Sequence, residues 1–172
     1  MGDPQTLTDF VRDSLRRYPA EEYALILWDH GTGPLEGVCL DEMNEPDRIS
    51  LDGLAQALDE ARLPQKLSWI GFDACLMSTL EMANAVAPYA DYMIASEETE
   101  PATGWNYAFL KGIESDSGSV ETARRIIDLY AQYSGEMLEY SDELHLEWFM
   151  LMNRYNDRKL RRVHAVQPLL RL

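Results

Sequence analysis

Two residues of this sequence have side chains suited to nucleophilic catalysis, and each follows an apolar run. Cys75 comes after LSWIGFDA, and His30 comes after YALILWD. A free thiol has a pKa of about 8.5, so it needs an imidazole or a helix N-terminus to form the reactive thiolate at neutral pH. His30 supplies the imidazole, and the segment directly after Cys75 is predicted to be helical. The pair predicts thiol-dependent catalysis.

The apolar runs predict the strands that position these two side chains. Residues 23–28 and 67–72 are continuous apolar stretches, which are typical of strands buried on both faces of a parallel sheet. In open α/β sheets, reactive groups gather just beyond the carboxyl ends of strands. If the two strands are neighbours, His30 and Cys75 meet at one edge of the sheet. The glycines after His30 would let the backbone approach a substrate, and their N–H groups would bind an oxyanion.

Asp73 is the third candidate, because it lies two residues before Cys75. Along an extended strand that spacing puts both side chains on one face, so a carboxylate there would bind a cationic substrate group. Capping of the following helix is an equally good interpretation of Asp73. A lone His after a strand is more often structural, and a lone Cys is often a small buried hydrophobe. The residue pattern alone leaves catalysis and a structural role open.

The rest of the chain alternates between the two kinds of element. The spacing of apolar residues predicts helices over 6–18, 51–62, 76–86 and 119–140, and a third strand over 92–96. Residues 31–49 are rich in Gly, Pro, Asn and Asp, which predicts a loop with at most a short strand at 38–40. This alternation implies an α/β fold, a three-layer sandwich around a mainly parallel sheet.

Composition excludes some classes of function. The formal net charge of −15 argues against nucleic-acid binding, and no apolar run is long enough to cross a membrane. The first ten residues lack the basic and apolar regions of a signal peptide. Residues 154–172 carry a net charge of +5, against −20 for the rest, which marks a candidate boundary. We therefore expect a catalytic domain over residues 1–140 and leave residues 141–172 unassigned.

Two cysteines are too few for a disulfide scaffold. The sequence has two cysteines, Cys39 and Cys75, and they lack the paired spacing of a zinc site. A single bridge between them stays open as an alternative. Cys39 lies in the predicted loop after the histidine strand, and we assign it no chemistry.

Two long segments, in order, resemble the clostripain family of cysteine peptidases. They are YALILWDHGTGPLEGVCLDE, which bears the histidine, and GFDACLMSTLEMANAVAPYADYMIASEETEPATGWNY, which bears the cysteine. The likeness covers roughly residues 3–110. It implies a caspase-like fold with His30 as the catalytic histidine, Cys75 as the nucleophile and Asp73 as the acid that binds a basic side chain.

The resemblance also implies an activity and its regulation. Members are endopeptidases that cut protein or peptide substrates after Arg or Lys, are secreted by bacteria and are made as zymogens that cleave themselves in the loop after the histidine strand. Arg48 is the basic residue in that loop and so is the candidate cleavage site. Some members need calcium, which is the cofactor that the resemblance raises; the residues themselves predict no metal site.

The sequence departs from the family at two places. Family members often carry a second acid before the Gly-Trp pair, where this chain has Ala102 and Thr103, so the basic specificity rests on Asp73 or on the acids at 97, 98 and 100. The family's domain usually begins with further strands, which this chain is expected to lack, leaving an open sheet edge and self-association. The alternatives are a catalytically inactive relative that acts as a binding or structural module, and a thiol-dependent acyl transferase.

Overall fold

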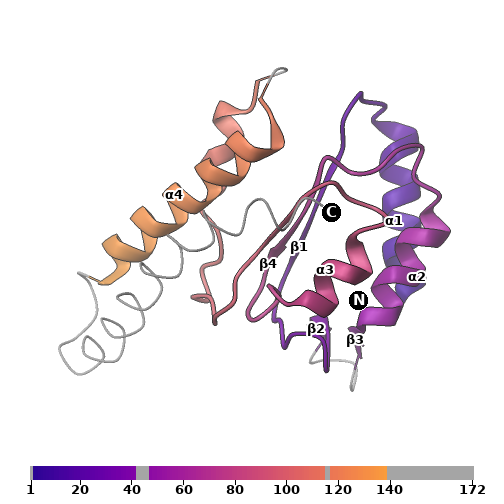
Figure 1. The fold of residues 1–172 in the computed structure, drawn as a ribbon, viewed down its shortest axis with the longest axis horizontal. Coiled ribbons are helices and arrows are strands. Elements are labelled where there is room, and N and C mark those ends of the chain that lie inside the picture. The colour runs from indigo at the N-terminus through magenta and orange to yellow at the C-terminus, as the bar shows by residue number, and fades with distance from the viewer. Residues whose placement is uncertain (1, 42–46, 115–116, 139–172) are drawn as a thin grey trace. The chain divides into compact units, whose positions relative to one another are not determined.

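The computed structural model describes residues 2–41, 47–114 and 117–138, which form two compact units (Figure 1). The first unit ends at Glu100, and the second begins at Pro101. The predicted catalytic residues all lie in the first unit. Predictions for residues 141–172 fall outside the described residues.

A parallel sheet of three strands organises the first unit. It consists of β1 (Ala24–Trp28), β4 (Trp69–Asp73) and β5 (Met93–Ala95), in the order β1-β4-β5. The register pairs Ala24 with Trp69 at one end and Trp28 with Asp73 at the other. The predicted α/β class with a parallel sheet is confirmed, and the histidine and cysteine strands are neighbours.

Three helices share one apolar core with one face of this sheet: α1 (Pro4–Arg17), α2 (Leu51–Ala61) and α3 (Leu80–Val86). In Figure 1, α1 and α2 run alongside each other next to the sheet. The main buried side chains of this core are Leu25, Leu27, Ile70, Phe72 and Met93 from the strands and Leu7, Val11, Leu54, Leu58, Met82 and Val86 from the helices. Alternate strand residues supply this face, as the period of a strand requires.

Helix α1 begins where its sequence provides a cap. The carboxylate of Asp3 accepts a hydrogen bond from the amide of Gln5 at 2.8 Å, and Pro4 occupies the first turn, where its missing N–H costs nothing. The buried hydroxyl of Thr8 lies 3.2 Å from the carbonyl oxygen of Ala57, which ties α1 to α2. The predicted helix is confirmed within two residues at its start.

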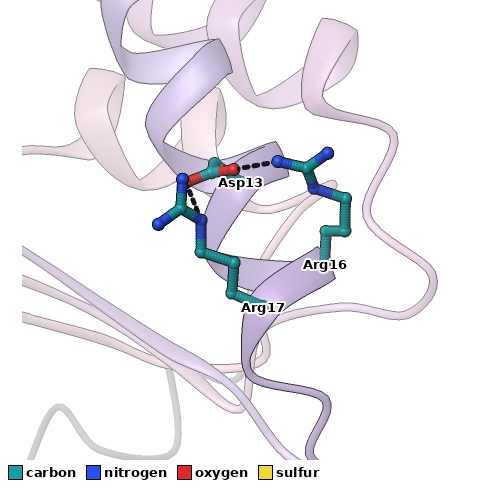
Figure 2. Close-up of polar contacts among 3 residues, drawn as sticks. All are labelled: Asp13, Arg16 and Arg17. Carbon is teal, nitrogen blue, oxygen red and sulfur yellow. Dashed lines mark hydrogen bonds and ion pairs between the residues drawn. The ribbon is translucent and has the colours of Figure 1, made fainter.

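The exposed side of α1 carries a small ion-pair network (Figure 2). Asp13 pairs with Arg16 at 2.5 Å and with Arg17 at 2.6 Å. The hydrogen bond from Arg16 and the nearby Arg17 hold the pKa of the Asp13 carboxyl below its usual value. Both arginines also lie in the last turn, where cations favour the helix dipole.

The prediction that the histidine strand is buried on both faces is wrong for β1. Its burial alternates, with Leu25 and Leu27 buried but Ala24 exposed and the Trp28 side chain 62% exposed, so it is not buried on both faces. Among the described strands β1 lies at the sheet edge, whereas every residue of central β4 is buried. An edge strand is less covered on the face away from the helices, which explains the difference. The edge position itself agrees with the expected open side.

The loop after β1 contains more structure than predicted. It forms an antiparallel hairpin of β2 (Val38–Asp41) and β3 (Asp47–Ile49), of which the sequence predicted only the first strand. Strand β3 is three residues long and polar, so it lacks the apolar alternation that marks a strand.

The second unit contains the short 3-10 helix η1 (Tyr107–Gly112) and α4 (Ser119–Leu138). The Arg125 guanidinium donates to the carbonyl of Gly112 at 3.3 Å, which links the two helices. The predicted helix from Ser119 is confirmed. No helix in the described part of the chain is long and apolar enough to span a membrane.

Candidate active site

His30 lies two residues beyond the end of β1. The Asp29 amide donates to the carbonyl of Asp73 at 3.4 Å, which extends the β1–β4 pairing by one residue. The His30 amide donates to the Asp29 carboxylate at 2.5 Å, and the His30 carbonyl accepts from the amide of Cys39 at 3.0 Å. The backbone of His30 is therefore held on both sides, while its side chain is exposed.

Gly31 brings the histidine loop against the cysteine loop. A Cβ added at Gly31 would lie 2.3 Å from the Cys75 carbonyl oxygen and 3.0 Å from the Cys75 nitrogen, which is closer than real Cβ atoms approach. Only glycine therefore fits there without movement of the backbone. Trp28 and Asp73 are paired at the ends of adjacent strands. His30 lies two residues after Trp28, and Cys75 lies two residues after Asp73. The predicted meeting place at one sheet edge is present.

Cys75 does not lie at a helix N-terminus, which corrects a second prediction. Helix α3 begins at Leu80, and its N-cap is Thr79, whose hydroxyl accepts from the Met82 amide at 3.3 Å. Leu76 has a φ of 62°, a left-handed conformation that cannot start an α-helix. The predicted role of a helix dipole in activating Cys75 is therefore wrong. The alternative that Asp73 caps this helix is wrong for the same reason.

The Cys75 thiol, which is partly buried, is hydrogen-bonded to the main chain of Glu100. Its sulfur accepts a hydrogen bond from the Glu100 amide at 3.1 Å, and the thiol donates to the Glu100 carbonyl oxygen at 3.8 Å. This contact was not predictable from the sequence, because it uses backbone atoms of a residue 25 positions away. Pro101 is the nearest sequence signal, since a proline favours an extended residue before it.

Two main-chain amides near Cys75 have no hydrogen-bond acceptor among the residues that the structure describes. Within residues 2–41, 47–114 and 117–138, neither the Gly31 N–H nor the Cys75 N–H donates a hydrogen bond. Buried backbone N–H groups are nearly always paired, so an unpaired N–H beside the Cys75 thiol is available for a ligand oxygen. The two amides belong to backbone segments in van der Waals contact. This arrangement can bind an oxyanion.

Asp73 is the last residue of β4, and only 2% of its surface is exposed. Asp73 also makes an interaction of its own. It lies on the sheet face opposite to Phe72, because strand side chains alternate. Asp73 is therefore a buried acid at the carboxyl end of β4, two residues before Cys75.

Arg48 lies within β3, where its guanidinium forms an ion pair with Glu36. The side chain is 27% exposed. A peptidase binds its substrate as an extended segment, so cleavage after Arg48 requires release of the segment from the β2–β3 hairpin.

Cys39 and Cys75 are both free thiols, so the bridge left open by the sequence is absent. Cys39 is buried, and burial together with the nearby Asp29 charge raises the pKa of its thiol from 9.0 to about 11. Its thiol is therefore neutral and unreactive at neutral pH.

The described residues contain no group of three or more His, Cys, Asp or Glu side chains that could hold a metal ion.

The chain is similar to known proteins in both sequence and fold. The model of the clostripain family matches residues 1–147. Clostripain from Hathewaya histolytica is 31% identical over 125 residues, which is 62% of this chain and 23% of that protein.

Two solved structures are similar in fold. A secreted C11 cysteine protease from Bacteroides thetaiotaomicron, in complex with an irreversible peptide inhibitor, has a TM-score of 0.66 and 25% identity over 78% of this chain and 38% of its own. An inactive zymogen C11 protease from Parabacteroides distasonis has a TM-score of 0.57 and 30% identity over 77% and 36%. The chain spans less than half the length of each of these relatives.

Proposed function

Because this chain belongs to the clostripain family, we propose that it acts as a cysteine endopeptidase, with Cys75 as nucleophile and His30 as its proton-transfer partner. The observation that carries the proposal is the β1–β4 register, because each residue lies two positions beyond the paired strand ends Trp28 and Asp73. The fit of Gly31 against the Cys75 backbone supports it.

The reaction proceeds through an acyl-enzyme. His30 takes the proton of the Cys75 thiol, and the sulfur attacks the scissile carbonyl carbon. The carbonyl oxygen gains negative charge, which the free amides of Gly31 and Cys75 stabilise. The C–N bond then breaks as His30 gives its proton to the leaving amine. Water, activated by His30, hydrolyses the thioester, releases the carboxylic acid and restores the thiol.

The proposed specificity is for Arg or Lys on the acyl side of the cleaved bond. Asp73 would bind the basic side chain by a charge-assisted hydrogen bond. Its position supports this role, because it is buried at the end of the cysteine strand. The net charge of −15 also favours cationic substrates.

Self-cleavage after Arg48 and secretion form the remaining part of the proposal. A neighbour in fold is described as an inactive zymogen and another as secreted. Arg48 is the basic residue of the described hairpin after β1.

The test uses paired fluorogenic peptides that end in Arg and in Asp. The Arg peptide should be hydrolysed and the Asp peptide should not. Cys75→Ala should abolish hydrolysis while retaining the far-UV circular dichroism of the wild type, and Cys39→Ala should stay active. Equal activity of Cys75→Ala and the wild type would refute the mechanism. A folded protein that cleaves neither peptide would favour the inactive binding module.

A further inference from the structure

Residues 96–100 run alongside the cysteine loop in the antiparallel sense. The Leu76 amide donates to the Glu98 carbonyl at 3.1 Å, and the Ser78 amide donates to the Ser96 carbonyl at 2.8 Å. The next contact in this series joins the Glu100 amide to the Cys75 sulfur at 3.1 Å. A side-chain sulfur therefore occupies the place that a backbone carbonyl would take in a regular ladder.

The contact with the Glu100 amide can stabilise a negative charge on Cys75, which α3 cannot do. With α3 starting at Leu80, the helix N-terminus lies too far along the chain to stabilise a charge on Cys75. A hydrogen bond donated to a charged group favours the charged form. We propose that the Glu100 main-chain amide is a catalytic group, which stabilises the Cys75 thiolate and fixes the direction of its sulfur.

The Glu100 amide and His30 follow different strands of the sheet. Strand β4 has β1 on one side and β5 on the other, so His30 follows one flanking strand and Glu100 follows the other. On the proposed function, on which this step rests, the thiol proton moves to the His30 imidazole. The electron pair stays on the sulfur, which keeps its hydrogen bond from Glu100.

The donor belongs to the backbone, so the identity of the Glu100 side chain is secondary. Pro101 restricts Glu100 to extended conformations, which lowers the entropy lost in holding its amide toward the sulfur. The two flanking hydrogen bonds, from Leu76 and Ser78, hold the segment in register. A negative charge on the Glu100 side chain would oppose a thiolate, so the stabilisation is assigned to the amide and not to the side chain.

The test removes the donor with Glu100→Pro and measures the rate of Cys75 alkylation by iodoacetamide across pH. Mass spectrometry assigns the modification to Cys75 and not to Cys39. Loss of a hydrogen bond to a charged atom should slow alkylation at neutral pH about tenfold and move the profile to higher pH. Glu100→Gln retains the N–H, so its profile should stay in place or move to lower pH.

Glu100→Pro also stiffens the backbone, because it adds a second proline beside Pro101. Thr99→Pro is the matched control for that effect. Thr99 is exposed, and its amide donates no hydrogen bond within the described part of the chain. It should keep the wild-type alkylation profile. An unchanged profile in Glu100→Pro, or an equal shift in Thr99→Pro, would overturn the proposal.

Amide hydrogen exchange tests the proposal without Glu100→Pro, in case that variant does not fold. The Glu100 amide should exchange faster in Cys75→Ala, which lacks the acceptor, and keep its protection in Cys75→Ser. Equal exchange in the wild type and Cys75→Ala would overturn the proposal. Both readouts are independent of peptide hydrolysis, so an inactive wild type would count against the proposed function alone.

Discussion

Gly31 and Cys75 are in backbone contact, although they lie 44 positions apart in the sequence. The space between them excludes even a methyl group, because a Cβ at Gly31 would approach the Cys75 carbonyl oxygen to 2.3 Å. This contact sets how far the loop that carries His30 lies from the backbone of Cys75. The proposed catalytic geometry depends on it, as does the pair of free amides.

Gly31→Ala should therefore move the two loops apart. Overpacking of this kind typically lowers the free energy of unfolding by about 1–3 kcal/mol, and we expect hydrolysis of the Arg peptide to fall at least about tenfold. Urea denaturation and steady-state kinetics measure the two effects. Gly118→Ala is the control, since an added Cβ there meets nothing within 4 Å. A fully active and equally stable Gly31→Ala would contradict the close fit.

Asp73→Asn should weaken cleavage after Arg far more than it changes the reactivity of Cys75. A buried carboxylate that pairs a guanidinium contributes about 2–5 kcal/mol, so kcat/KM for the Arg peptide should fall by a factor of about thirty or more. The rate of Cys75 alkylation by iodoacetamide measures the reactivity of the thiol and should be unchanged. A collapse of alkylation would show that Asp73 is structural.

Thr103→Asp tests the acid that the family often has and this chain lacks. Restoring a carboxylate should raise the ratio of kcat/KM for Arg over a neutral residue, because a second negative charge favours the cation. Thr103→Asn adds similar volume without charge and should leave the ratio unchanged. An equal effect of both variants would exclude an electrostatic cause.

Much of the site was predictable because it depends on strands. The apolar runs before His30 and Cys75 predicted two buried parallel strands with both residues just beyond their carboxyl ends. The start of α3 was not predictable from periodicity. Leu76, Met77 and Leu80 fit a helical spacing, and only the Thr79 cap and the left-handed Leu76 show that the helix starts later.

The contact of Glu100 with Cys75 was beyond sequence reasoning for a different reason. It joins a backbone amide to a sulfur across 25 residues, and a backbone amide has no residue type to recognise. The partial exposure of β1 was missed because apolar runs indicate burial without showing which strand lies at the edge of a sheet. Local sequence patterns therefore predict the strands and the reactive residues that follow them. Tertiary packing decides the backbone contact at Cys75 and which strand lies at the edge of the sheet.

Cys39 should make the protein less stable at high pH. Its folded pKa of about 11 lies above the ordinary 9.0, so the folded protein keeps this proton where the unfolded chain loses it. The stabilisation is complete below pH 9 and is lost as the pH rises through 11. Denaturation midpoints from pH 8 to 11 should fall less in Cys39→Ser than in the wild type. Parallel curves for the two proteins would contradict a buried neutral thiol.

The edge of β1 should support self-association. Among the described strands β1 pairs only with β4, so its other side presents unpaired backbone groups, and Ala24 and Trp28 are exposed on one face. Such an edge is a template for pairing with a second copy. Light scattering after size exclusion should therefore show dimers or larger species that increase with protein concentration. They should also increase with salt, because salt screens the repulsion between copies of net charge −15.

A charge placed on this edge should reverse the association. Ala24→Lys lies at the end of β1 remote from His30 and should shift the protein toward monomer, since lysine on an edge strand opposes pairing. Phe10→Lys is the matched control: Phe10 is 60% exposed on α1, away from the sheet edge, and its replacement should leave the distribution unchanged. If Phe10→Lys and not Ala24→Lys yields monomers, the surface of α1 carries the association. A wild type that is monomeric at every concentration and salt would show that the edge of β1 is already covered.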